Sequence, residues 1–142
     1  MSIKLDTTDR AILNILQTNS RTTIKEMAAQ LNLSTTPIFE RVKKLEREKI
    51  ITHYVALIDT SKVGKKLHAF IDISIKDHSN KALEKFVKQV ASYDEVLECH
   101  HISGQSDFLL QVVIEDMEAY NRFILDKLST VENVGKVESR FS

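Results

Sequence analysis

The sequence contains one cysteine, one proline and three glycines in 142 residues, and it contains no tryptophan. A single cysteine cannot form an intrachain disulfide or supply a multi-cysteine zinc site. So little glycine and proline excludes collagen-like and low-complexity chains. No apolar run approaches the roughly 18 residues of a membrane span, and residues 1–6 lack the apolar segment of a secretory signal. We therefore expect a cytoplasmic protein with one ordinary domain or two small ones.

Charge is balanced over the whole chain, with 20 basic and 20 acidic residues, but it is unevenly distributed along it. Residues 1–66 carry a net charge of +5 and residues 67–142 carry −5 when histidine is counted as neutral. Such an asymmetry suggests that the first part meets a polyanion while the second part has another task. A split of this size can also arise by chance.

Three short helices are predicted in the first part, over residues 7–18, 24–31 and 35–48. Asp6 is placed to cap the first helix, because its carboxylate can accept hydrogen bonds from the unpaired N–H groups of the first turn. Thr23 and Glu26 have the spacing of a capping box at the start of the second, and Ser34 is placed to cap the third. Each helix carries apolar residues at helical spacing, so the three can share one core.

The second and third helices, joined by a tight turn, have the pattern of a helix-turn-helix. Burying Ile38, Val42 and Leu45 leaves the other side of the third helix polar and rich in lysine and arginine, which suits a helix in the DNA major groove. The alternative is a three-helix bundle whose surface is basic but has no nucleic-acid partner. The pattern alone leaves both interpretations open.

Residues 50–58 are apolar and β-branched, which predicts an extended strand such as the wing of a winged helix. Residues 59–66 contain Gly64 and several polar side chains, which predicts a linker. The sequence thus divides into a helical domain over residues 1–58, a linker over 59–66 and a second domain over 67–142.

The second domain alternates between strand and helix patterns. Strands are predicted over residues 67–76, 96–103, 108–114 and 134–141, and helices over 80–92 and 116–128. The order is βαββαβ, that of a ferredoxin-like fold, which makes the whole chain an α+β protein. A unit of about 75 residues has a marginal core of its own, so self-association is expected.

The run Cys99-His100-His101 raises the question of a metal site. Neighbouring strand residues point to opposite faces, so Cys99 and His101 share a face that His100 does not. Two ligands do not make a site and no third is nearby, so no metal is expected. The sequence also has no phosphate-binding loop, nucleophile elbow or paired-carboxylate signature, so an enzyme is not expected.

Three motifs resemble those of the Lrp/AsnC (feast/famine) family of transcription regulators. Residues 5–13, LDTTDRAIL, resemble the family's L-D-x-x-D-x-x-I-L start, and residues 33–46, LSTTPIFERVKKLE, resemble its recognition helix. Residues 98–110, ECHHISGQSDFLL, resemble its C-H-x-x-[ST]-G-x-x-D-[YF] hairpin. The motifs occur in the family's order and span nearly the whole chain.

This resemblance implies a winged helix-turn-helix joined to a ferredoxin-like, effector-binding domain. Family members dimerise through that domain, often assemble into octamers and bind amino acids between dimers. The implied partners are double-stranded DNA, further copies of the chain and a small amino acid, with no cofactor and no membrane.

Two positions depart from the family pattern. Glu40 stands where many members carry a basic or neutral residue, which argues against a base contact there. Lys49 replaces a glycine that is common after the recognition helix, and a left-handed backbone costs a lysine about 1 kcal/mol.

The residues expected to contact DNA surround the third helix: Thr23, Ser34, Thr35, Thr36, Glu40, Arg41, Lys43, Lys44 and Arg47. Thr35 and Thr36 are placed at the helix start to reach base edges, whereas the lysines and arginines can hold phosphates without reading sequence. Ser34 can instead act only as a helix cap, and Arg41 can lie on the bundle surface or pair with a nearby acid.

The residues expected to bind the effector form a single turn: Ser103, Gly104, Gln105, Ser106 and Asp107. The carboxylate of Asp107 suits an α-ammonium group, and the N–H groups of the turn suit an α-carboxylate. Gly104 is expected to supply a positive φ that other residues resist. Asp107 can alternatively do no more than stabilise its own turn.

The sequence therefore predicts a sequence-specific, DNA-binding transcription regulator that responds to a small effector, with an amino acid as the expected class. The alternative is an amino-acid-binding protein whose basic half recognises no DNA. A gel shift with the chain's own promoter region distinguishes the two.

Overall fold

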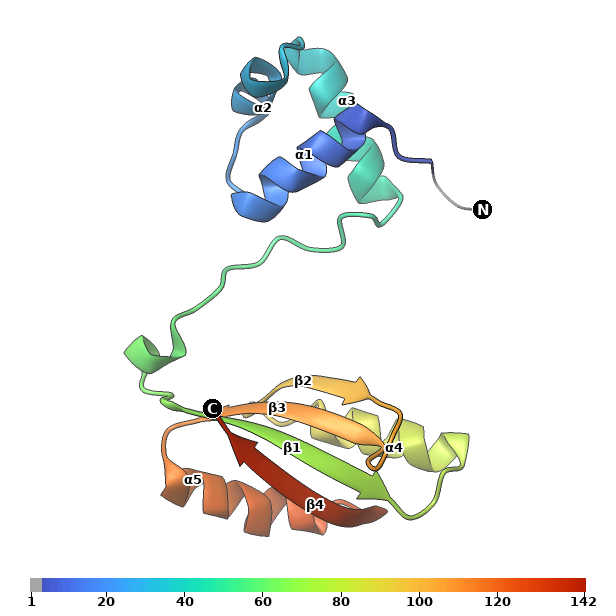
Figure 1. Cartoon of the computed structure of the whole chain (residues 1–142), viewed down its shortest axis with the longest axis vertical. Helices are drawn as coiled ribbons and strands as arrows, with labels where there is room; N and C mark the ends of the chain where they lie inside the picture. Colours follow the sequence, from blue (N-terminus) through green and yellow to red (C-terminus); the bar gives the residue numbers. More distant parts are fainter. Residues whose placement is uncertain (1–3) are drawn as a thin grey trace. The chain divides into compact units, whose positions relative to one another are not determined.

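The chain, described here by a computed structural model of residues 4–142, divides into two compact units between Leu57 and Ile58. The first unit contains three helices: α1 (Thr7–Thr18), α2 (Ile24–Leu31) and α3 (Thr35–Arg47) (Figure 1). These bounds agree with the predicted helices to within one residue. Over the described residues, none of the helices is both long and apolar enough to cross a membrane.

Reciprocal capping boxes start the first two helices; the caps at Asp6 and Thr23 were predicted, whereas the return contact from Asp9 was not. The carboxylate of Asp6 accepts from the backbone N–H of Asp9 at 2.8 Å, and the Asp9 carboxylate accepts from the N–H of Asp6 at 3.2 Å. At α2, the hydroxyl of Thr23 accepts from the N–H of Glu26 at 3.1 Å, and the Glu26 carboxylate accepts from the N–H of Thr23 at 2.7 Å. Each box satisfies first-turn donors that have no partner within the helix.

The cap predicted for α3 is only partly correct. Ser34 has the extended backbone of an N-cap residue, but its hydroxyl makes no capping hydrogen bond. The third residue of the helix is Pro37, which has no N–H to donate, so the donor that a capping hydroxyl commonly uses is absent. The hydroxyl of Ser34 therefore remains available for another partner.

The core of the first unit is built mainly from apolar side chains of the three helices. It consists of Ile12 from α1, Met27 and Ala28 from α2, and Ile38, Val42 and Leu45 from α3. The three residues predicted to face inward on α3 are all buried, so the opposite side of that helix faces solvent.

The strand predicted over residues 50–58 is wrong. Ile50 and Ile51 pack partly against the helical core, but residues 52–59 form no strand, and 52–58 make no backbone hydrogen bond in the structure. Leu57 is 96% exposed and Val55 and Ile58 are also exposed. An apolar, β-branched run becomes a strand only when another strand pairs with it, and the described part of this chain supplies no such neighbour.

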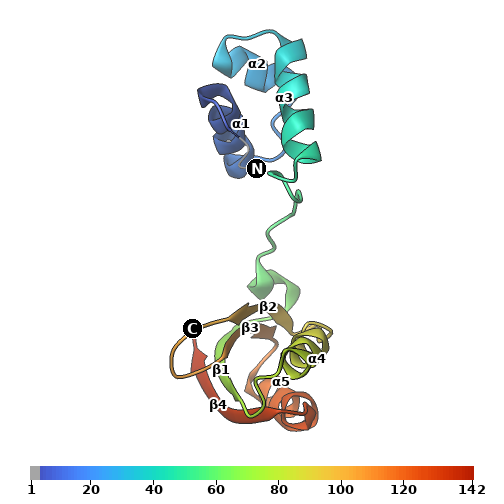
Figure 2. The same ribbon diagram turned by 90° about the vertical axis from the view of Figure 1, so that its right-hand side faces the viewer.

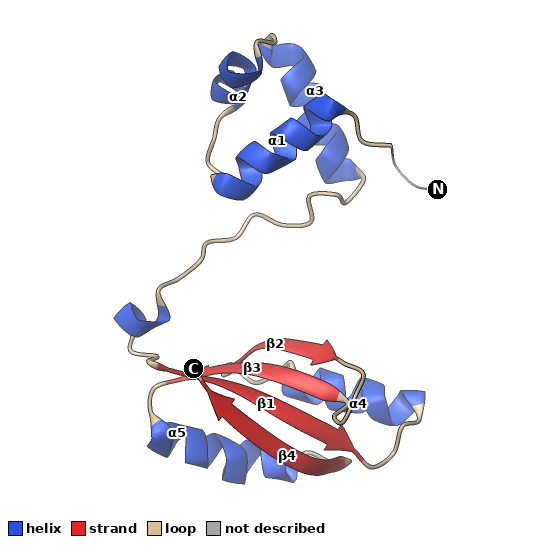
Figure 3. Ribbon diagram, viewed as in Figure 1, coloured by secondary structure: helices blue, strands red, loops and turns tan. Residues whose placement is uncertain are grey.

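The second unit consists of a four-stranded antiparallel sheet with helices on one face (Figures 2 and 3). It begins with a short 3₁₀ helix, η1, over Thr60–Val63, inside the range predicted as linker. The bounds that follow are β1 (Leu67–Ile75), α4 (Asn80–Val90), β2 (Val96–His101), β3 (Phe108–Ile114), α5 (Met117–Arg122) and β4 (Val134–Phe141). The strand order is β2-β3-β1-β4. The predicted βαββαβ order is confirmed.

Only one face of this sheet carries the core. Alternate residues of β1, from Ala69 to Ile75, are buried against α4 and α5, whereas His68, Phe70, Asp72 and Ser74 lie on the other face and are only partly buried. The period of two residues follows from strand geometry. No helix of the described residues covers this second face, which we call the open face of the sheet.

The last predicted helix, over residues 116–128, differs from a regular α-helix. After α5 the chain makes a π-helical turn over Phe123–Lys127 and a 3₁₀ turn over Leu128–Thr130. Phe123 and Leu128 are both buried in the core, although they are five residues apart. A π-helical turn brings residues at that spacing onto one side, whereas the prediction assumed α-helical spacing throughout.

Lys49 adopts the left-handed conformation expected from the sequence, with φ of +58°. The backbone reverses here directly after α3, and the N–H groups of Ile50 and Ile51 both donate to the carbonyl of Leu45. The position therefore carries a conformational cost that a glycine would not.

Replacing Lys49 by glycine should raise the free energy of unfolding of the first unit by up to about 1 kcal/mol, because glycine adopts this φ without a steric penalty. Urea denaturation followed by helical circular dichroism measures the change. The Lys49→Ala variant is the matched control, since alanine loses the same charge but keeps the penalty. If the free energy of unfolding rose by the same amount in the alanine variant, the effect would come from the lost charge, and the conformational explanation would be wrong.

Candidate functional site

The solvent-facing side of α3 is polar and bears most of the residues predicted to contact DNA. Thr35, Thr36, Glu40 and Arg47 are exposed, and Lys44 is partly exposed. Lys43 donates to Glu46 at 3.0 Å, and its ammonium lies 5.6 Å from the centre of the Phe39 ring. Phe39 is 46% exposed and was missed by the sequence analysis, which assigned it to neither the core nor the DNA-binding face.

Arg41 lies to one side of this face and binds acids of the same unit. Its Nη1 atom donates to Asp6 at 2.6 Å and to Asp9 at 2.8 Å. The Asp9 side chain is only 2% exposed and is the one buried charged residue in the described chain. A buried carboxylate needs a partner of opposite charge. The geometry therefore favours the alternative role for Arg41, which is to tie α3 to the start of α1.

The remaining two predicted DNA contacts lie at helix starts. The hydroxyl of Thr23 is engaged in its capping box with Glu26. Ser34 is exposed and its hydroxyl makes no capping bond, for the reason given above. Of these two hydroxyls, the one at Ser34 is better placed to meet a phosphate.

The turn predicted to bind the effector connects β2 to β3. Gly104 has φ of +134°, as expected of a position that side chains resist. Ser103, Gly104 and Gln105 are exposed, and Ser106 is half-buried. The hydroxyl of Ser74 donates to the carbonyl of Gln105 at 3.4 Å, so this turn is tied to β1.

Asp107 holds the turn against the end of β1. One carboxylate oxygen accepts from the N–H of Ile75 at 2.7 Å, and the other lies 2.9 Å from Nε2 of His78. The hydrogen bond from Ile75 and the one from His78 lower the pKa of the Asp107 carboxyl. Because both oxygens already have partners, this geometry favours the local, stabilising role over a contact with an α-ammonium group.

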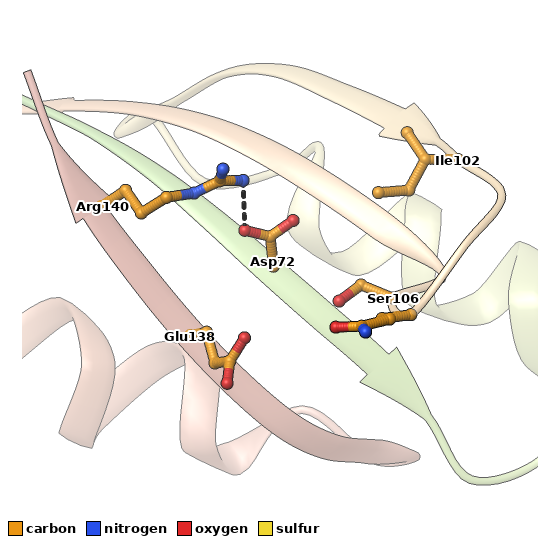
Figure 4. Close-up of a pocket in the computed structure, with 6 residues that line it drawn as sticks. Asp72, Ile102, Ser106, Glu138 and Arg140 are labelled. Carbon is orange, nitrogen blue, oxygen red and sulfur yellow. Dashed lines mark hydrogen bonds and ion pairs between the residues drawn. The ribbon is translucent and has the colours of Figure 1, made fainter.

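The same turn borders a hollow of about 280 Å³ on the open face, lined by Asp72, Ile102, Gln105, Ser106, Glu138 and Arg140. Figure 4 shows the guanidinium of Arg140, from β4, meeting the carboxylate of Asp72, from β1. Glu138 lies beside them, and Ile102 and Ser106 come from the connection between β2 and β3. The hollow is thus lined by one guanidinium, two carboxylates, a hydroxyl, an amide and an apolar side chain.

Asp72, Glu138 and Arg140, which line this hollow, are not among the residues predicted from the sequence. Register places Asp72 opposite Glu138 and Phe70 opposite Arg140 on neighbouring strands. Asp72 is 15% exposed, whereas Arg140 and Glu138 are largely exposed. An ion pair with Lys136 lowers the pKa of the Glu138 carboxyl, so it is ionised at neutral pH. The available signal was the alternation of charged with apolar residues along both strands.

The cysteine and histidines of β2 do not form a metal centre in this structure. Cys99 lies half-buried on the core side, where desolvation raises the pKa of its thiol. The ring of His101 stacks on Phe108, with centroids 4.8 Å apart. Among residues 4–142, no three potential ligands come together in a group that could hold a metal ion.

Comparison with known proteins identifies both units. Residues 5–52 match the family described as winged helix-turn-helix DNA-binding, and residues 68–142 match that described as the Lrp/AsnC ligand binding domain. The chain is 37% identical over 137 residues to the leucine-responsive regulatory protein of Rhizobium meliloti, covering 96% of this chain and 88% of that protein. It is 35% identical over 138 residues to the DNA-binding transcriptional activator DecR of Escherichia coli, covering 97% and 91%.

Solved structures of other regulators are similar to this chain over nearly its whole length. A transcriptional regulator from Neisseria meningitidis in complex with L-Met has a TM-score of 0.92 and 38% sequence identity, covering 98% of this chain and 90% of that one. An AsnC family transcriptional regulator from Agrobacterium tumefaciens has a TM-score of 0.91 and 37% identity, covering 97% and 90%. The predicted α+β fold, with a helix-turn-helix unit followed by a four-stranded sheet, is therefore confirmed.

The contacts of Asp6 make the stability of the first unit depend on pH. The N–H of Asp9 and the guanidinium of Arg41 lower the pKa of the Asp6 carboxyl below its ordinary value of 3.8. A lowered folded-state pKa stabilises the fold above the unfolded value, and this contribution is lost as the pH falls through the folded-state pKa. The Asp6→Asn variant should therefore be less stable than the parent at pH 7, with the difference shrinking below about pH 4.

Urea denaturation at a series of pH values from 7 to 2.5 measures this difference. Glu40→Gln serves as the control, because it removes a carboxylate of the same unit that makes no hydrogen bond or ion pair in the structure. A difference between the Asp6→Asn variant and the parent that stayed constant down to pH 2.5 would show that the ion pair with Arg41 contributes nothing.

Proposed function

The chain belongs to the Lrp/AsnC family of DNA-binding transcription regulators, and on that basis we propose how its two units divide the task. The first unit docks α3 in the major groove of an operator. The second binds an α-amino acid on the open face of its sheet and joins copies of the chain. The observation that carries the proposal is the polar, cationic outer face of α3, opposite a fully apolar inner face.

The start of α3 supplies the base-reading residues. In a helix-turn-helix the N-terminal part of the second helix lies nearest the base edges. Thr35 and Thr36 are exposed in the first turn, directly after the free hydroxyl of Ser34. Lys43, Lys44 and Arg47 follow toward the other end, where they meet phosphates and add affinity that does not depend on sequence. Arg41 positions the helix through Asp6 and Asp9 and does not itself hold DNA.

The hollow beside the turn between β2 and β3 suits the charges of an amino acid. We propose that the guanidinium of Arg140 takes the α-carboxylate, because an arginine fork matches a planar carboxylate. Glu138 and Asp72 take the α-ammonium, and Ile102 contacts the side chain. Gln105 and Ser106, two of the residues predicted from the sequence, contribute polar groups from the turn. Asp107 fixes the shape of that turn.

Amino acids with apolar side chains are the first candidates for the effector. The Neisseria meningitidis relative was solved in complex with L-Met, and the hollow in this chain contains one apolar side chain, Ile102. Its volume of about 280 Å³ admits a single small molecule rather than a peptide. L-methionine is therefore the first effector to test.

We further propose that the chain forms homodimers and that dimers assemble into octamers. The open face supports the first step, because it exposes part of Phe70 and Leu109 with no covering helix among the described residues. A unit of this size has a marginal core of its own, so association through the open face would add to its stability. The exposed apolar residues Val55, Leu57 and Ile58 offer a second surface for contact between copies.

Salt dependence tests the DNA-binding part. The logarithm of affinity for a duplex from the chain's own promoter region should fall linearly with the logarithm of salt concentration, by about 0.9 for each phosphate neutralised. Lys44→Ala should make this slope less steep by about 0.9 for each bound helix. It should also lower the affinity for all DNA sequences by the same factor. Fluorescence anisotropy titrations at four salt concentrations measure both quantities.

Lys62→Ala is the matched control, because Lys62 lies in η1 and pairs with Asp59, outside the α3 face. Its slope should equal that of the parent. Binding by the parent that did not change with salt would contradict the proposed phosphate contacts, and absence of any binding would favour the amino-acid-binding alternative.

Calorimetry tests the effector site. Arg140→Ala removes a charge-assisted contact with the α-carboxylate that contributes about 1.5–3 kcal/mol, so affinity for the amino acid should fall roughly ten- to hundredfold. L-methionine is titrated first and the other amino acids after it. Arg122→Ala is the control, since Arg122 pairs with Glu118 on α5, on the opposite side of the sheet. Equal affinities in the parent and the Arg140→Ala variant would remove the hollow as the effector site.

A further inference from the structure

Glu40 is exceptional among the acidic residues of the first unit. Asp6 and Asp9 pair with Arg41, Glu26 closes a capping box, Glu46 accepts from Lys43 and Tyr54, and Glu48 lies 3.8 Å from Arg47. Within residues 4–57, Glu40 alone among the acids has neither a hydrogen bond nor an ion pair. Its carboxylate is therefore a free negative charge on an otherwise cationic helix face.

The position of Glu40 places that charge toward DNA. Thr36 lies one turn before it and Lys43 and Arg47 lie three and seven residues after it, so all four share the outer side of α3. The buried residues Ile38, Val42 and Leu45 occupy the opposite side. Glu40 is the sixth residue of the helix, within the N-terminal half that approaches base edges.

The neighbouring lysine does not neutralise this carboxylate. Lys43 could reach it along the helix, but its ammonium instead donates to Glu46 at 3.0 Å and lies over the ring of Phe39. Lys43 is thus engaged with Phe39 and Glu46 and makes no ion pair with Glu40. An unpaired carboxylate facing phosphates weakens binding to DNA in general, so it needs a specific donor in the groove to be compatible with tight binding.

Among the base edges of the major groove, one donor suits a carboxylate best. Cytosine presents its N4 amino group there as a donor, and glutamate is an established acceptor for it. Adenine also presents an amino group, but its N7 acceptor lies alongside and repels a carboxylate, which can only accept. Guanine N7 and O6 and thymine O4 are acceptors and repel it as well.

We propose that Glu40 is a specificity-determining residue that accepts a hydrogen bond from the N4 amino group of a cytosine in the operator. This inference rests on the proposed docking of α3 in the major groove. It gives a base contact to a residue that the sequence analysis included among the DNA contacts, although the departure from the family pattern argued against a base contact there. Glu40 discriminates by exclusion as well as by attraction, because every other base places an acceptor against its carboxylate.

Selection of binding sites from a pool of random duplexes tests the inference, using the full-length chain and its Glu40→Ala, Glu40→Gln and Glu48→Ala variants. The parent should select a C·G pair at one position of each half-site. The Glu40→Ala variant should lose that preference, with discrimination at the position falling by about fivefold or more, while its affinity for random DNA rises. The Glu40→Gln variant should shift the preference toward adenine, because an amide can pair with both N6 and N7.

Glu48→Ala is the matched control, because Glu48 follows the end of the same helix and its removal changes the net charge by the same amount. It should tighten binding to random DNA but keep the cytosine preference. Circular dichroism of each variant confirms that α3 is intact, as expected for an exposed side chain without partners.

The outcomes separate the two levels of the argument. If the parent enriches a motif and the Glu40 variants enrich the same motif with the same base frequencies, the inference is overturned while DNA recognition by α3 stands. If the parent enriches no sequence at all, the proposed function itself fails and the inference fails with it. A cytosine preference that is lost in Glu40→Ala and moved in Glu40→Gln establishes the contact.

Discussion

The contact on which the DNA-binding unit depends is the pair of hydrogen bonds from Arg41 to Asp6 and Asp9. The two carboxylates sit at the first turn of α1, where they also cap its N–H groups. One guanidinium nitrogen therefore joins the start of α1 to the middle of α3. Because Asp9 is buried, removing its partner would leave an uncompensated charge in the core, which is far costlier than losing a surface ion pair. This contact and the packing of Ile38, Val42 and Leu45 together hold α3 against α1.

In the second unit, a carboxylate likewise stabilises the local backbone. Asp107 fixes a turn by accepting from the backbone of β1, as Asp6 fixes a helix start by accepting from its first turn. Both residues belong to the motifs that resemble the family's signatures, and in both cases the structure gives the acid a framework role. The charged groups proposed to meet partners lie elsewhere, at the unpaired Glu40 on α3 and at the Arg140–Asp72 ion pair on the open face. The acids of the family motifs thus stabilise the local structure, and the residues proposed to contact partners lie outside these two acids.

The fold could be predicted from the sequence where local interactions decide it. Capping residues and apolar spacing define α1, α2 and α3, and alternation defines β1 and β4. The segment 50–58 could not be predicted, because strand formation depends on a pairing partner that local sequence does not reveal. The same limit applies to the site. Asp72 and Arg140 are far apart in the chain, and only the register between β1 and β4 brings them together. The turn at residues 103–107 could be predicted as a turn because its residues are contiguous in the chain.

The unpaired segment over residues 52–59 sets how far apart two DNA-binding units can reach when they belong to one assembly. Eight extended residues span at most about 28 Å, and residues 52–58 have no backbone hydrogen bonds that fix a shorter path. In the dimer proposed above, once one DNA-binding unit has bound its half-site, the other is confined near the next, so its binding becomes intramolecular and depends on an effective concentration. Tether length then selects among operators by the spacing of their half-sites, in addition to their sequence.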